Sequence, residues 1–354
     1  MSNRLRKSQP PTISRRLQNR SRHPSGPRTI NWGIIGPGRI AHKFAQGLAS
    51  VPNAKLFAIA SRSEDRARDF ARQYKAPYYY QGYEKITQNP EVDIVYIATP
   101  HTFHFENTLM CLENGKPVLC EKPFTITRGQ LQRLVDTARR NKVFLMEALW
   151  TRFLPTIQKI IEIRDSGQLG PIKAIYADFG FKAPVDHDGR LYNLKLGGGA
   201  LLDIGIYPVF LSLLLLGKPS EIKSAAIMSE TGADESCSIL FKYGNEAIAN
   251  LACTITSDTP IEANIIFEKG RIRIHRRWFT PSSLTIFESD DKKKDLTFKY
   301  DGNGYHFEAV EAMKCLEKGL IECPDLPLEF SLELMGLLDE IRNQCGIYYP
   351  GYEE

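Results

Sequence analysis

A carboxylate, an amine and a proline follow one another at Glu121, Lys122 and Pro123, directly after the apolar run 118–120. The apolar run predicts a buried strand, so the charged pair stands at its carboxyl end, the edge at which open parallel sheets bind ligands. Pro123 restricts its own backbone and that of Lys122, which favours a positioned amine. A structural Glu-Lys ion pair is the alternative, because exposed pairs are common and contribute little stability.

A second carboxylate and a phenol stand four residues apart, at Asp203 and Tyr207. If both lie on one helical turn, this spacing puts their side chains on the same face. Pro208 complicates such a helix, because proline cannot donate the backbone hydrogen bond to Ile204. A core tyrosine whose hydroxyl bonds a buried aspartate would explain the pair by itself, and the presence of Lys122 in the chain favours a chemical role instead.

Residues 30–41 form the segment that must position these side chains. It predicts a strand ending at Ile35, a tight turn with Gly36 and Gly38, and an amphipathic helix. In a Gly-x-Gly-x-x-Ala turn the first glycine permits the bend, the second lets the backbone approach a pyrophosphate, and the alanine, Ala41, lets helix and strand pack closely. An ordinary glycine turn is the alternative, and the flanking strand and helix favour a dinucleotide site.

The end of the second predicted strand bears on the choice of dinucleotide. NAD sites usually place Asp or Glu there for the ribose hydroxyls, whereas NADP sites lack that acid and supply Arg. This chain has Ser61, Arg62 and Ser63, and the planar guanidinium of Arg62 suits a phosphate. The pattern favours NADP over NAD. In the alternative interpretation Ser63 caps the next helix and Arg62 is merely solvated.

Residues 29–150 predict a dinucleotide-binding domain, because apolar runs alternate with helical patterns as in a doubly wound parallel sheet. After residues 30–35 the predicted strands are 55–60, 92–98, 117–120 and 143–146, and the predicted helices are 64–74, 104–114 and 128–141.

Residues 151–354 predict a second, α+β domain on a largely antiparallel sheet, for substrate binding and oligomerisation. Hairpin signals at 243–245 and 268–270 join some of its strands. The charge run 292–294 predicts a solvated turn. The predicted strands are 172–181, 221–228, 237–242, 247–256, 261–267, 271–275 and 283–287, with helices at 153–166, 305–318 and 328–344.

The net charge of +5 is unevenly distributed. Residues 1–28 hold eight Arg and Lys and no acid, and subtracting those eight from 46 leaves 38 basic residues against 41 acidic ones, a net charge of −3. A body of this charge is not expected to bind nucleic acid. The tail is too polar to bury a core, so disorder is predicted over 1–28. An organellar transit peptide and a twin-arginine signal are the alternatives, although no apolar segment follows Arg15-Arg16.

Cysteine, histidine and apolar patterns exclude several other classes. The seven cysteines are scattered without close pairs in sequence, which argues against a disulfide framework and favours a reducing compartment. A cytoplasmic location is therefore expected. His101 and His104 lie three apart without the thiols or carboxylates of a metal site, so no metal is expected. The longest apolar run noted, 209–216, is too short to span a bilayer, and no membrane partner is predicted.

Together these segments resemble the Gfo/Idh/MocA oxidoreductase family over residues 30–350. Two further stretches, 147–153 and 340–350, are similar to the branch that contains dimeric dihydrodiol dehydrogenases and NADP-dependent D-xylose dehydrogenases. The motifs that carry the resemblance are Gly36-Pro37-Gly38-Arg39-Ile40-Ala41, Ala98-Thr99-Pro100 with His104, Gly115-Lys116-Pro117 running to Glu121-Lys122-Pro123, and residues 197–207.

The resemblance implies a Rossmann domain followed by an α+β domain with a large, mostly antiparallel open sheet, an α/β protein overall. It implies hydride transfer between a nicotinamide and a carbinol carbon of a sugar or cyclic diol, with Lys122, Asp203 and Tyr207 at the reacting centre. Many relatives carry His at the position of Tyr207 and Asn at that of His101. The expected cofactor contacts are Gly36, Gly38, Arg39, Ile40, Ala41, Ser61, Arg62, Thr99, Pro100, His104, Glu121 and Lys122.

Lys122 would affect the ionisation of Tyr207 if the two side chains are close. A Lys ammonium about 4 Å from Tyr207, at an effective dielectric near ~20, would favour the phenolate by roughly 4 kcal/mol, or about three pKa units, as an upper bound. Tyr207 would then serve as the base in alcohol oxidation, with Asp203 orienting the substrate or Lys122. Aromatic faces with a few polar donors suit a sugar or cyclic diol. Candidate residues of this kind are Trp150, Arg152, Phe179 and Arg190, although such residues are about as often core or ion-pair partners.

Two other functions remain open from sequence. A redox-assisted glycosidase of the same family would hold NAD tightly, which Arg62 argues against. A non-catalytic nucleotide-sensing regulator would not need Lys122, Asp203 and Tyr207 together. A homodimer or homotetramer is expected, because the exposed face of the β-rich domain would need covering.

Overall fold

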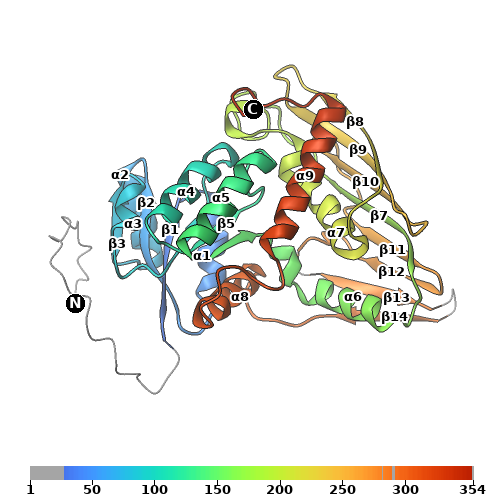
Figure 1. The fold of residues 1–354 in the computed structure, drawn as a ribbon, viewed down its shortest axis with the longest axis horizontal. Helices are drawn as coiled ribbons and strands as arrows, with labels where there is room; N and C mark the ends of the chain where they lie inside the picture. Colours follow the sequence, from blue (N-terminus) through green and yellow to red (C-terminus); the bar gives the residue numbers. More distant parts are fainter. Residues whose placement is uncertain (1–27, 281, 289–291, 353–354) are drawn as a thin grey trace.

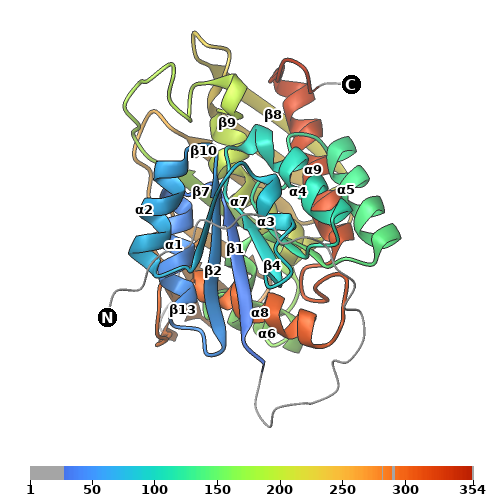
Figure 2. The same cartoon turned by 90° about the vertical axis from the view of Figure 1, so that its left-hand side faces the viewer.

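The computed structural model describes residues 28–280, 282–288 and 292–352. The disordered tail predicted for residues 1–28 therefore lies outside the described residues, except for Arg28. The described part comprises a six-stranded parallel sheet with helices on both faces, followed by an eight-stranded sheet that carries helices on the side facing the first domain (Figures 1 and 2).

The first sheet has the strand order β3-β2-β1-β4-β5-β6, with every neighbouring pair parallel. This is the doubly wound order whose ligand crevice opens where the strand order reverses, between β1 and β4. Its strands are β1 (Ile30–Ile35), β2 (Ala54–Ser61), β3 (Tyr78–Gln81), β4 (Ile94–Ile97), β5 (Val118–Glu121) and β6 (Leu145–Ala148), and its helices are α1 (Arg39–Leu48), α2 (Glu64–Tyr74), α3 (Glu84–Thr87), α4 (His104–Glu113) and α5 (Arg128–Asn141).

The second sheet has the order β14-β13-β12-β11-β7-β10-β9-β8, and only the β7–β10 pair is parallel among its described pairs. The predicted antiparallel domain is confirmed. Its strands are β7 (Ile172–Gly180), β8 (Glu221–Met228), β9 (Asp234–Lys242), β10 (Ile248–Thr254), β11 (Ala263–Phe267), β12 (Gly270–Ile274), β13 (Ser283–Phe287) and β14 (Lys293–Thr297), and the helices of this half are α6 (Pro155–Ser166), α7 (Ile206–Leu216), α8 (Tyr305–Glu317) and α9 (Leu328–Cys345).

Two sequence predictions need correction. The charge run 292–294 is not simply a turn, because Lys293 and Lys294 belong to edge strand β14, where both stay exposed. Lysines suit an edge strand, since their charge discourages pairing with another sheet. The short elements β3 and α3 were absent from the predicted set.

The helix that carries Asp203 is continuous with α7. A π-helical stretch, Leu201–Gly205, runs directly into α7, so the wider turn precedes Pro208 and helix continues past it. The helical segment Leu194–Leu216 is long and apolar enough to cross a membrane. The prediction that the longest apolar segment is 209–216, too short to span a bilayer, is therefore corrected. However, 89% of its most apolar window is buried inside the fold, so its composition is accounted for by packing between the large sheet and α9.

The last two helices return to the first domain. Helix α8 packs on α1, and α9 packs on α5 and α7. In Figure 1 α9 runs between the two sheets. Ser331 on α9 donates a 2.7 Å hydrogen bond to buried Glu147 on β6, and a second oxygen of Glu147 accepts from the Phe124 backbone at 3.1 Å. The two halves are thus joined beside the loop that carries Lys122.

Candidate active site

A cavity of about 1020 Å³ lies at the carboxyl edge of the parallel sheet. Loops that follow β1, β2, β4 and β5 form one wall, and the 181–192 segment with Asp203 forms the other. Its lining residues are Gly36, Pro37, Gly38, Arg39, Ile40, Lys43, Ser61, Arg62, Ser63, Arg66, Tyr83, Ala98, Thr99, Pro100, His101, His104, Glu121, Lys122, Phe181, Lys182, Ala183, Pro184, Asp186, Gly189, Arg190, Leu191, Tyr192 and Asp203.

The glycine turn has the geometry of a dinucleotide cradle. Gly36 has a φ of +86°, and a Cβ there would lie 2.9 Å from the backbone of Ala98, so the bend requires glycine. A Cβ on Gly38 would meet only one atom, 4.0 Å away, so the open cavity begins at this backbone. Helix α1 starts at Arg39 without a side-chain cap. Its first N–H groups therefore suit a pyrophosphate.

Basic residues gather where β2 ends. Ser63 caps α2 by accepting a 3.4 Å hydrogen bond from the Arg66 backbone, and Arg62 lines the cavity. The Arg62 guanidinium lies 5.5 Å from the centre of the Phe103 ring. Capping by Ser63 and a cavity-facing Arg62 thus occur together. Arg66 also lines this end, and sequence reasoning missed it because helical arginines are usually solvated.

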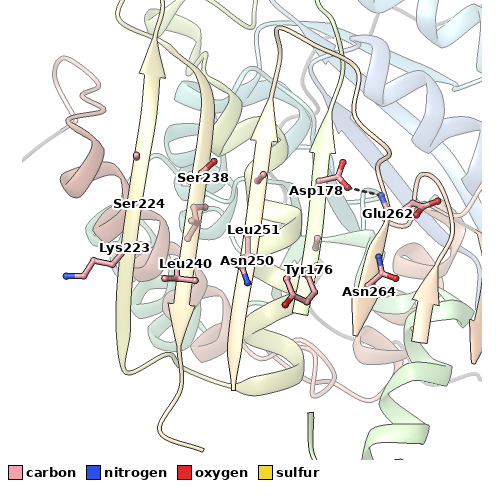
Figure 3. A pocket seen from close by; sticks show the side chains of 14 residues that line it. Tyr176, Asp178, Lys223, Ser224, Ser238, Leu240, Asn250, Leu251, Glu262 and Asn264 are labelled. Atoms are coloured by element: carbon pink, nitrogen blue, oxygen red, sulfur yellow. Dashed lines mark hydrogen bonds between the residues drawn. The ribbon is translucent and has the colours of Figure 1, made fainter. Parts of the chain in front are cut away.

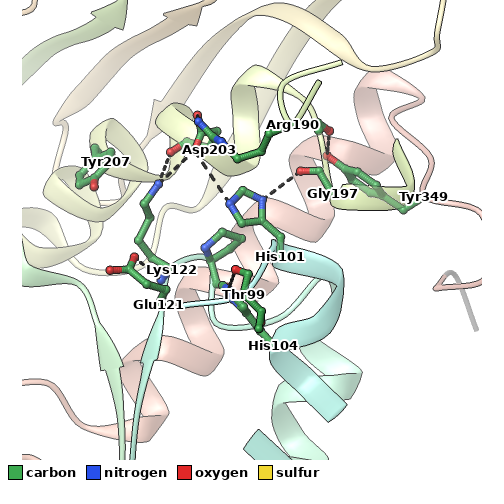
Figure 4. Close-up of polar contacts among 12 residues, drawn as sticks. Thr99, His101, His104, Glu121, Lys122, Arg190, Gly197, Asp203, Tyr207 and Tyr349 are labelled. Carbon is green, nitrogen blue, oxygen red and sulfur yellow. Dashed lines mark hydrogen bonds and ion pairs between the residues drawn. The ribbon is translucent and has the colours of Figure 1, made fainter. Parts of the chain in front are cut away.

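Lys122 and Asp203 meet across the cavity (Figure 4). The Lys122 Nζ donates to the Asp203 backbone oxygen at 2.5 Å and lies 3.4 Å from Oδ1 of its carboxylate. Burial would lower the pKa of Lys122, but the surrounding Tyr207, Asp203 and Glu121 raise it overall. Lys122 is therefore an ammonium.

Arg190 and His101 complete the surroundings of Asp203. Arg190 forms a bidentate pair with its carboxylate, at 2.7 and 3.1 Å. Burial opposes ionisation of Asp203, but Lys122 and Arg190 lower its pKa overall. His101 donates from Nδ1 to the Gly197 carbonyl at 2.9 Å, and its Nε2 lies 3.9 Å from Oδ1 of Asp203. Burial lowers the pKa of His101 to about 3, so this ring is neutral.

Tyr207 lies beside Lys122 within an aromatic group. The Lys122 Nζ is 5.0 Å from the centre of the Tyr207 ring, and Trp150 Nε1 donates to the Tyr207 hydroxyl at 3.3 Å. Phe179 lies 5.7 Å and Phe279 5.0 Å from the phenol ring, centre to centre. Burial raises the pKa of Tyr207 more than Lys122 lowers it. The predicted net lowering is therefore corrected: Tyr207 is a neutral phenol in this site.

Glu121 and His104 support the loop that carries Lys122. Tyr96 donates a hydrogen bond to Glu121, and burial raises the pKa of Glu121 to about 7. His104 is fully buried, with Nδ1 2.7 Å from the Pro123 carbonyl and Nε2 2.9 Å from the Thr99 carbonyl. Burial lowers its pKa to about 4, so a single ring N–H serves one of the two carbonyls at a time. These bonds give His104 a positioning role between two cavity loops.

The triple glycine before Asp203 is fixed by residues distant in sequence. Asp234 accepts a 2.6 Å hydrogen bond from the Leu201 backbone, and Tyr349 donates a 2.7 Å bond to the Gly198 carbonyl. Gly199 has a φ of +129°, and a Cβ there would lie 2.1 Å from the Asp234 carboxylate. Only glycine fits this approach, so the glycine run sets the position of the helix that bears Asp203.

The predicted residues divide into two groups. The predicted reacting residues come together, and the predicted cofactor residues other than Ala41, which packs in the core, line the cavity. Arg190 lines the cavity and holds Asp203, whereas Trp150 and Phe179 lie next to Tyr207 and, like Tyr207, are not among the cavity-lining residues. Arg152 is placed elsewhere, because it pairs with Asp325 at 3.1 Å beyond the cavity lining. Residues that the sequence did not single out as contacts include Lys43, Arg66, Tyr83, Lys182 and Tyr192, whereas His101, noted as a position where relatives carry Asn, lines the cavity.

Comparison with known protein families agrees with this geometry. Residues 30–149 match the model described as oxidoreductase family, NAD-binding Rossmann fold, and residues 157–273 match the GFO/IDH/MocA C-terminal domain. The chain belongs to the Gfo/Idh/MocA family of oxidoreductases, and its first domain is an NAD-binding Rossmann domain.

Full-length relatives are also similar to this chain. It is 36% identical over 332 residues to trans-1,2-dihydrobenzene-1,2-diol dehydrogenase of Xenopus tropicalis, covering 90% of this chain and 99% of the relative. The human enzyme of the same name is 33% identical, with 91% and 98% covered. Among solved structures, KijD10, a 3-ketoreductase from Actinomadura kijaniata in complex with NADP and TDP-benzene, is similar with a TM-score of 0.80, 26% identity and coverage of 90% and 98%.

Proposed function

We propose that this protein is an NADP-dependent oxidoreductase that transfers a hydride between the nicotinamide and a carbinol carbon of a sugar or cyclic diol. The observation that carries the proposal is the meeting of Lys122 and Asp203, with Tyr207 beside them, at the edge where the Rossmann domain binds its nucleotide. An ammonium, a carboxylate and a phenol at one point supply what alcohol–carbonyl interconversion requires from a protein.

The nucleotide-binding end favours NADP. The first cavity residue after Ser61 is Arg62 rather than an acid, and Arg66 joins it from the next helical turn. Two guanidinium groups suit a phosphate on the ribose, because each can bind two of its oxygens. The structure of the 3-ketoreductase with NADP is consistent with this choice.

The substrate class follows from the surroundings of Tyr207 and from the relatives. Trp150 contacts the Tyr207 hydroxyl, Phe179 and Phe279 pack around the phenol ring, and Arg190 and His101 supply polar atoms near Asp203. A substrate ring that has an apolar face and neighbouring hydroxyl groups can pack on the aromatic side chains and hydrogen-bond to the polar ones. The relatives named as dihydrodiol dehydrogenases point to cyclic diols, and pyranoses share the same features.

The protein's own groups move one proton and hold the charge. When bound, the nicotinamide supplies or accepts the hydride at the reacting carbon. For carbonyl reduction, the Tyr207 hydroxyl gives its proton to the substrate oxygen, and the ammonium of Lys122 stabilises the phenolate that remains. Asp203 holds Lys122 in place, and Arg190 keeps Asp203 ionised and oriented. For alcohol oxidation, the phenolate must form first and then accepts the hydroxyl proton.

A substrate panel tests the proposed function. Aldoses, trans-dihydrodiols and dicarbonyls are each incubated with the full chain and with NADP(H) or NAD(H), and the reduced nicotinamide absorbance is followed. We expect net turnover with NADP(H) and at least one diol, aldose or carbonyl. Glycoside cleavage without net absorbance change, or nucleotide binding without turnover on any compound, would contradict the proposal in favour of a glycosidase or a regulator.

We also propose that the outer face of the eight-stranded sheet joins copies of this chain in a homodimer or homotetramer. Figure 3 shows side chains of several strands across this face, which has a shallow hollow of about 610 Å³. Tyr176, which lines this hollow, is 49% exposed and offers a large aromatic surface that a second copy could cover. Light scattering should give a mass above that of one chain, and Tyr176→Glu should lower it.

A further inference from the structure

A second cluster of reactive side chains lies outside the cavity. Glu311 and Cys315 on α8 and Cys323 in the loop before α9 place one carboxylate oxygen and two sulfurs within 4.8 Å of one another. Both cysteines are buried free thiols, and they hydrogen-bond to each other. The chain thus contains a thiol pair that its sequence spacing did not indicate.

The surroundings of Cys323 favour its thiolate. The Cys315 thiol donates to the Cys323 sulfur, and the backbone N–H groups of Asp325 and Leu326 point to it as well. The positive charge of Arg152 lies near this sulfur. Arg152 is only 8% exposed, and its Nε and Nη1 have no hydrogen-bond partner among the residues that the structure describes. The pKa of Cys323 is lowered overall, chiefly because Cys315 donates to it, and this outweighs the opposing effects of burial and of Glu311.

A second thiol pair supplies an internal comparison. Cys237 on β9 hydrogen-bonds to Cys345 at the end of α9, so these sulfurs are also neighbours. Here burial raises the pKa of Cys237, and its partner Cys345 and the nearby Asp234 raise it further. Cys345 is the less buried member of this pair. If solvent access alone decided which pair is oxidised, Cys237–Cys345 would react first. If the fraction of thiolate decides it, Cys315–Cys323 reacts first.

We propose that Cys315 and Cys323 form a redox-active thiol pair, which a hydroperoxide oxidises to a disulfide that lowers turnover reversibly. The Cys323 thiolate attacks one peroxide oxygen; an S–O bond forms, the O–O bond breaks and hydroxide leaves. The Cys315 sulfur then attacks this sulfenic acid. The S–S bond forms, the S–O bond breaks, and the thiol proton leaves with the hydroxyl as water. The hydroxide from the first step takes up the proton that Cys323 released when it ionised, so two thiols lose two electrons and hydrogen peroxide becomes two waters.

The same donors could suggest a metal site, but the local charge favours the redox assignment. The Arg152 guanidinium close to Cys323 repels a divalent cation, and the third donor, Glu311, already pairs with Lys314 at 3.0 Å. The Arg152 guanidinium instead suits a site in which one sulfur carries the negative charge, and the ion pair with Lys314 offsets the repulsion that Glu311 exerts on that sulfur.

Two contacts and one shared turn connect the thiol pair to the catalytic end of the fold. The Ile321 carbonyl in the loop before Cys323 accepts a 3.0 Å hydrogen bond from Leu145 on β6. Trp150, which donates to Tyr207, lies in the same 3₁₀ turn as Arg152 and stacks on Tyr305 of α8 at 4.1 Å. Disulfide formation removes the negative charge that Arg152 faces and ties α8 to the loop, so the Trp150 turn shifts.

The test treats the reduced full chain with stoichiometric hydrogen peroxide, blocks free thiols, and identifies linked peptides by mass spectrometry. We expect a Cys315–Cys323 linked peptide two hydrogen atoms lighter than its reduced form, a severalfold loss of turnover, and recovery of both with dithiothreitol. Arg152→Met should slow linkage, whereas Cys345→Ser should leave linkage and turnover loss unchanged. Cys315→Ser and Cys323→Ala should each abolish linkage.

Several outcomes would overturn the proposal. One is that peroxide links Cys237 to Cys345 before it links any other pair. Another is that Cys315 and Cys323 can still be alkylated after peroxide treatment, which would show that both remain free thiols. A third is that the purified chain contains stoichiometric zinc, which is lost in Cys323→Ala. Linkage with unchanged turnover would refute the effect on activity. The turnover readout rests on the proposed function, but peptide linkage does not, so a chain without dehydrogenase activity would still test the thiol pair.

Discussion

The ammonium of Lys122 lies 5.0 Å from the centre of the Tyr207 ring, although Lys122 follows β5 of the Rossmann sheet and Tyr207 belongs to α7 beneath the large sheet. Neither domain alone contains the pair. The proton donor and the charge that stabilises its conjugate base are brought together only when the two halves pack.

Removing the Tyr207 hydroxyl should abolish most turnover. Tyr207→Phe keeps the ring that packs on Phe279 but cannot donate a proton, so we expect kcat to fall by roughly 10²–10⁴-fold. NADPH affinity, measured by fluorescence titration, should stay unchanged because Tyr207 does not line the nucleotide cradle. A variant with near-normal kcat would exclude Tyr207 as the proton donor.

The two reaction directions should respond differently to pH. Since the pKa of Tyr207 is raised above 10, the phenol needed for carbonyl reduction persists through pH 7–9, while the phenolate needed for oxidation becomes more abundant with rising pH. We expect the oxidation kcat to rise across this range and the reduction kcat to stay flat. Lys122→Met should reduce oxidation further at every pH, because it removes the charge that lowers this pKa. Identical profiles in both directions would contradict the assignment.

Arg62 should set the nucleotide preference. Loss of a charge-assisted contact to a phosphate costs about 1.5–3 kcal/mol, so Arg62→Ala should raise the KM for NADP roughly 10–100-fold and leave the KM for NAD nearly unchanged. Arg68→Ala is the matched control, because Arg68 lies on α2, the helix that directly follows Arg62, pairs with Asp65 and does not line the cavity. Equal losses for NADP and NAD would show that Arg62 does not bind the distinguishing phosphate.

Gly199 should be irreplaceable for structural reasons. Gly199→Ala puts a Cβ against Asp234 at a positive φ, so we expect a loss of roughly 2–4 kcal/mol in unfolding free energy together with reduced turnover. Gly115→Ala has a positive φ of +69° but meets nothing within 4 Å, so it should cost only ~1 kcal/mol and leave kcat intact. Urea unfolding with kinetics on both variants separates the two; equal effects would contradict the close approach.

Buried Glu308 should make stability depend on pH. Its two oxygens have no hydrogen-bond partner in the described residues, and burial raises its pKa well above 4.5. A raised pKa gives stability that is present below about pH 4.5 and is lost as pH rises toward the folded-state pKa. Glu308→Gln should therefore gain stability relative to wild type above pH 4.5, by up to about 1.4 kcal/mol per pH unit. Glu317→Gln, exposed on the same helix, should show no such trend in urea unfolding at pH 5–8.

Local patterns predicted the nucleotide half well. The bounds of α2 and α5 agree with the predicted 64–74 and 128–141, because both helices begin at a side-chain cap, Ser63 and Thr127. Gly36, Arg62 and Lys122 were identifiable for a related reason: each stands at the end of an apolar strand, where the sequence itself marks the sheet edge.

Features that depend on distant packing could not be predicted. The raised pKa of Tyr207 comes from burial among aromatic rings supplied by Trp150, Phe179 and Phe279. Arg152 has the composition of a substrate contact, yet Asp325, far along the chain, holds it away from the cavity. The local sequence around Tyr207 and Arg152 does not show which distant residues will pack against them.

The hydrogen bond from Tyr349 to Gly198 has a consequence for how the protein matures. During synthesis the carboxylate-bearing turn emerges long before the segment that clamps it, so a nascent chain can complete its nucleotide cradle while the reacting centre is still unsecured. Catalytic competence would then arrive only after the segment around Tyr349 has been synthesised, well after the nucleotide-binding half is complete.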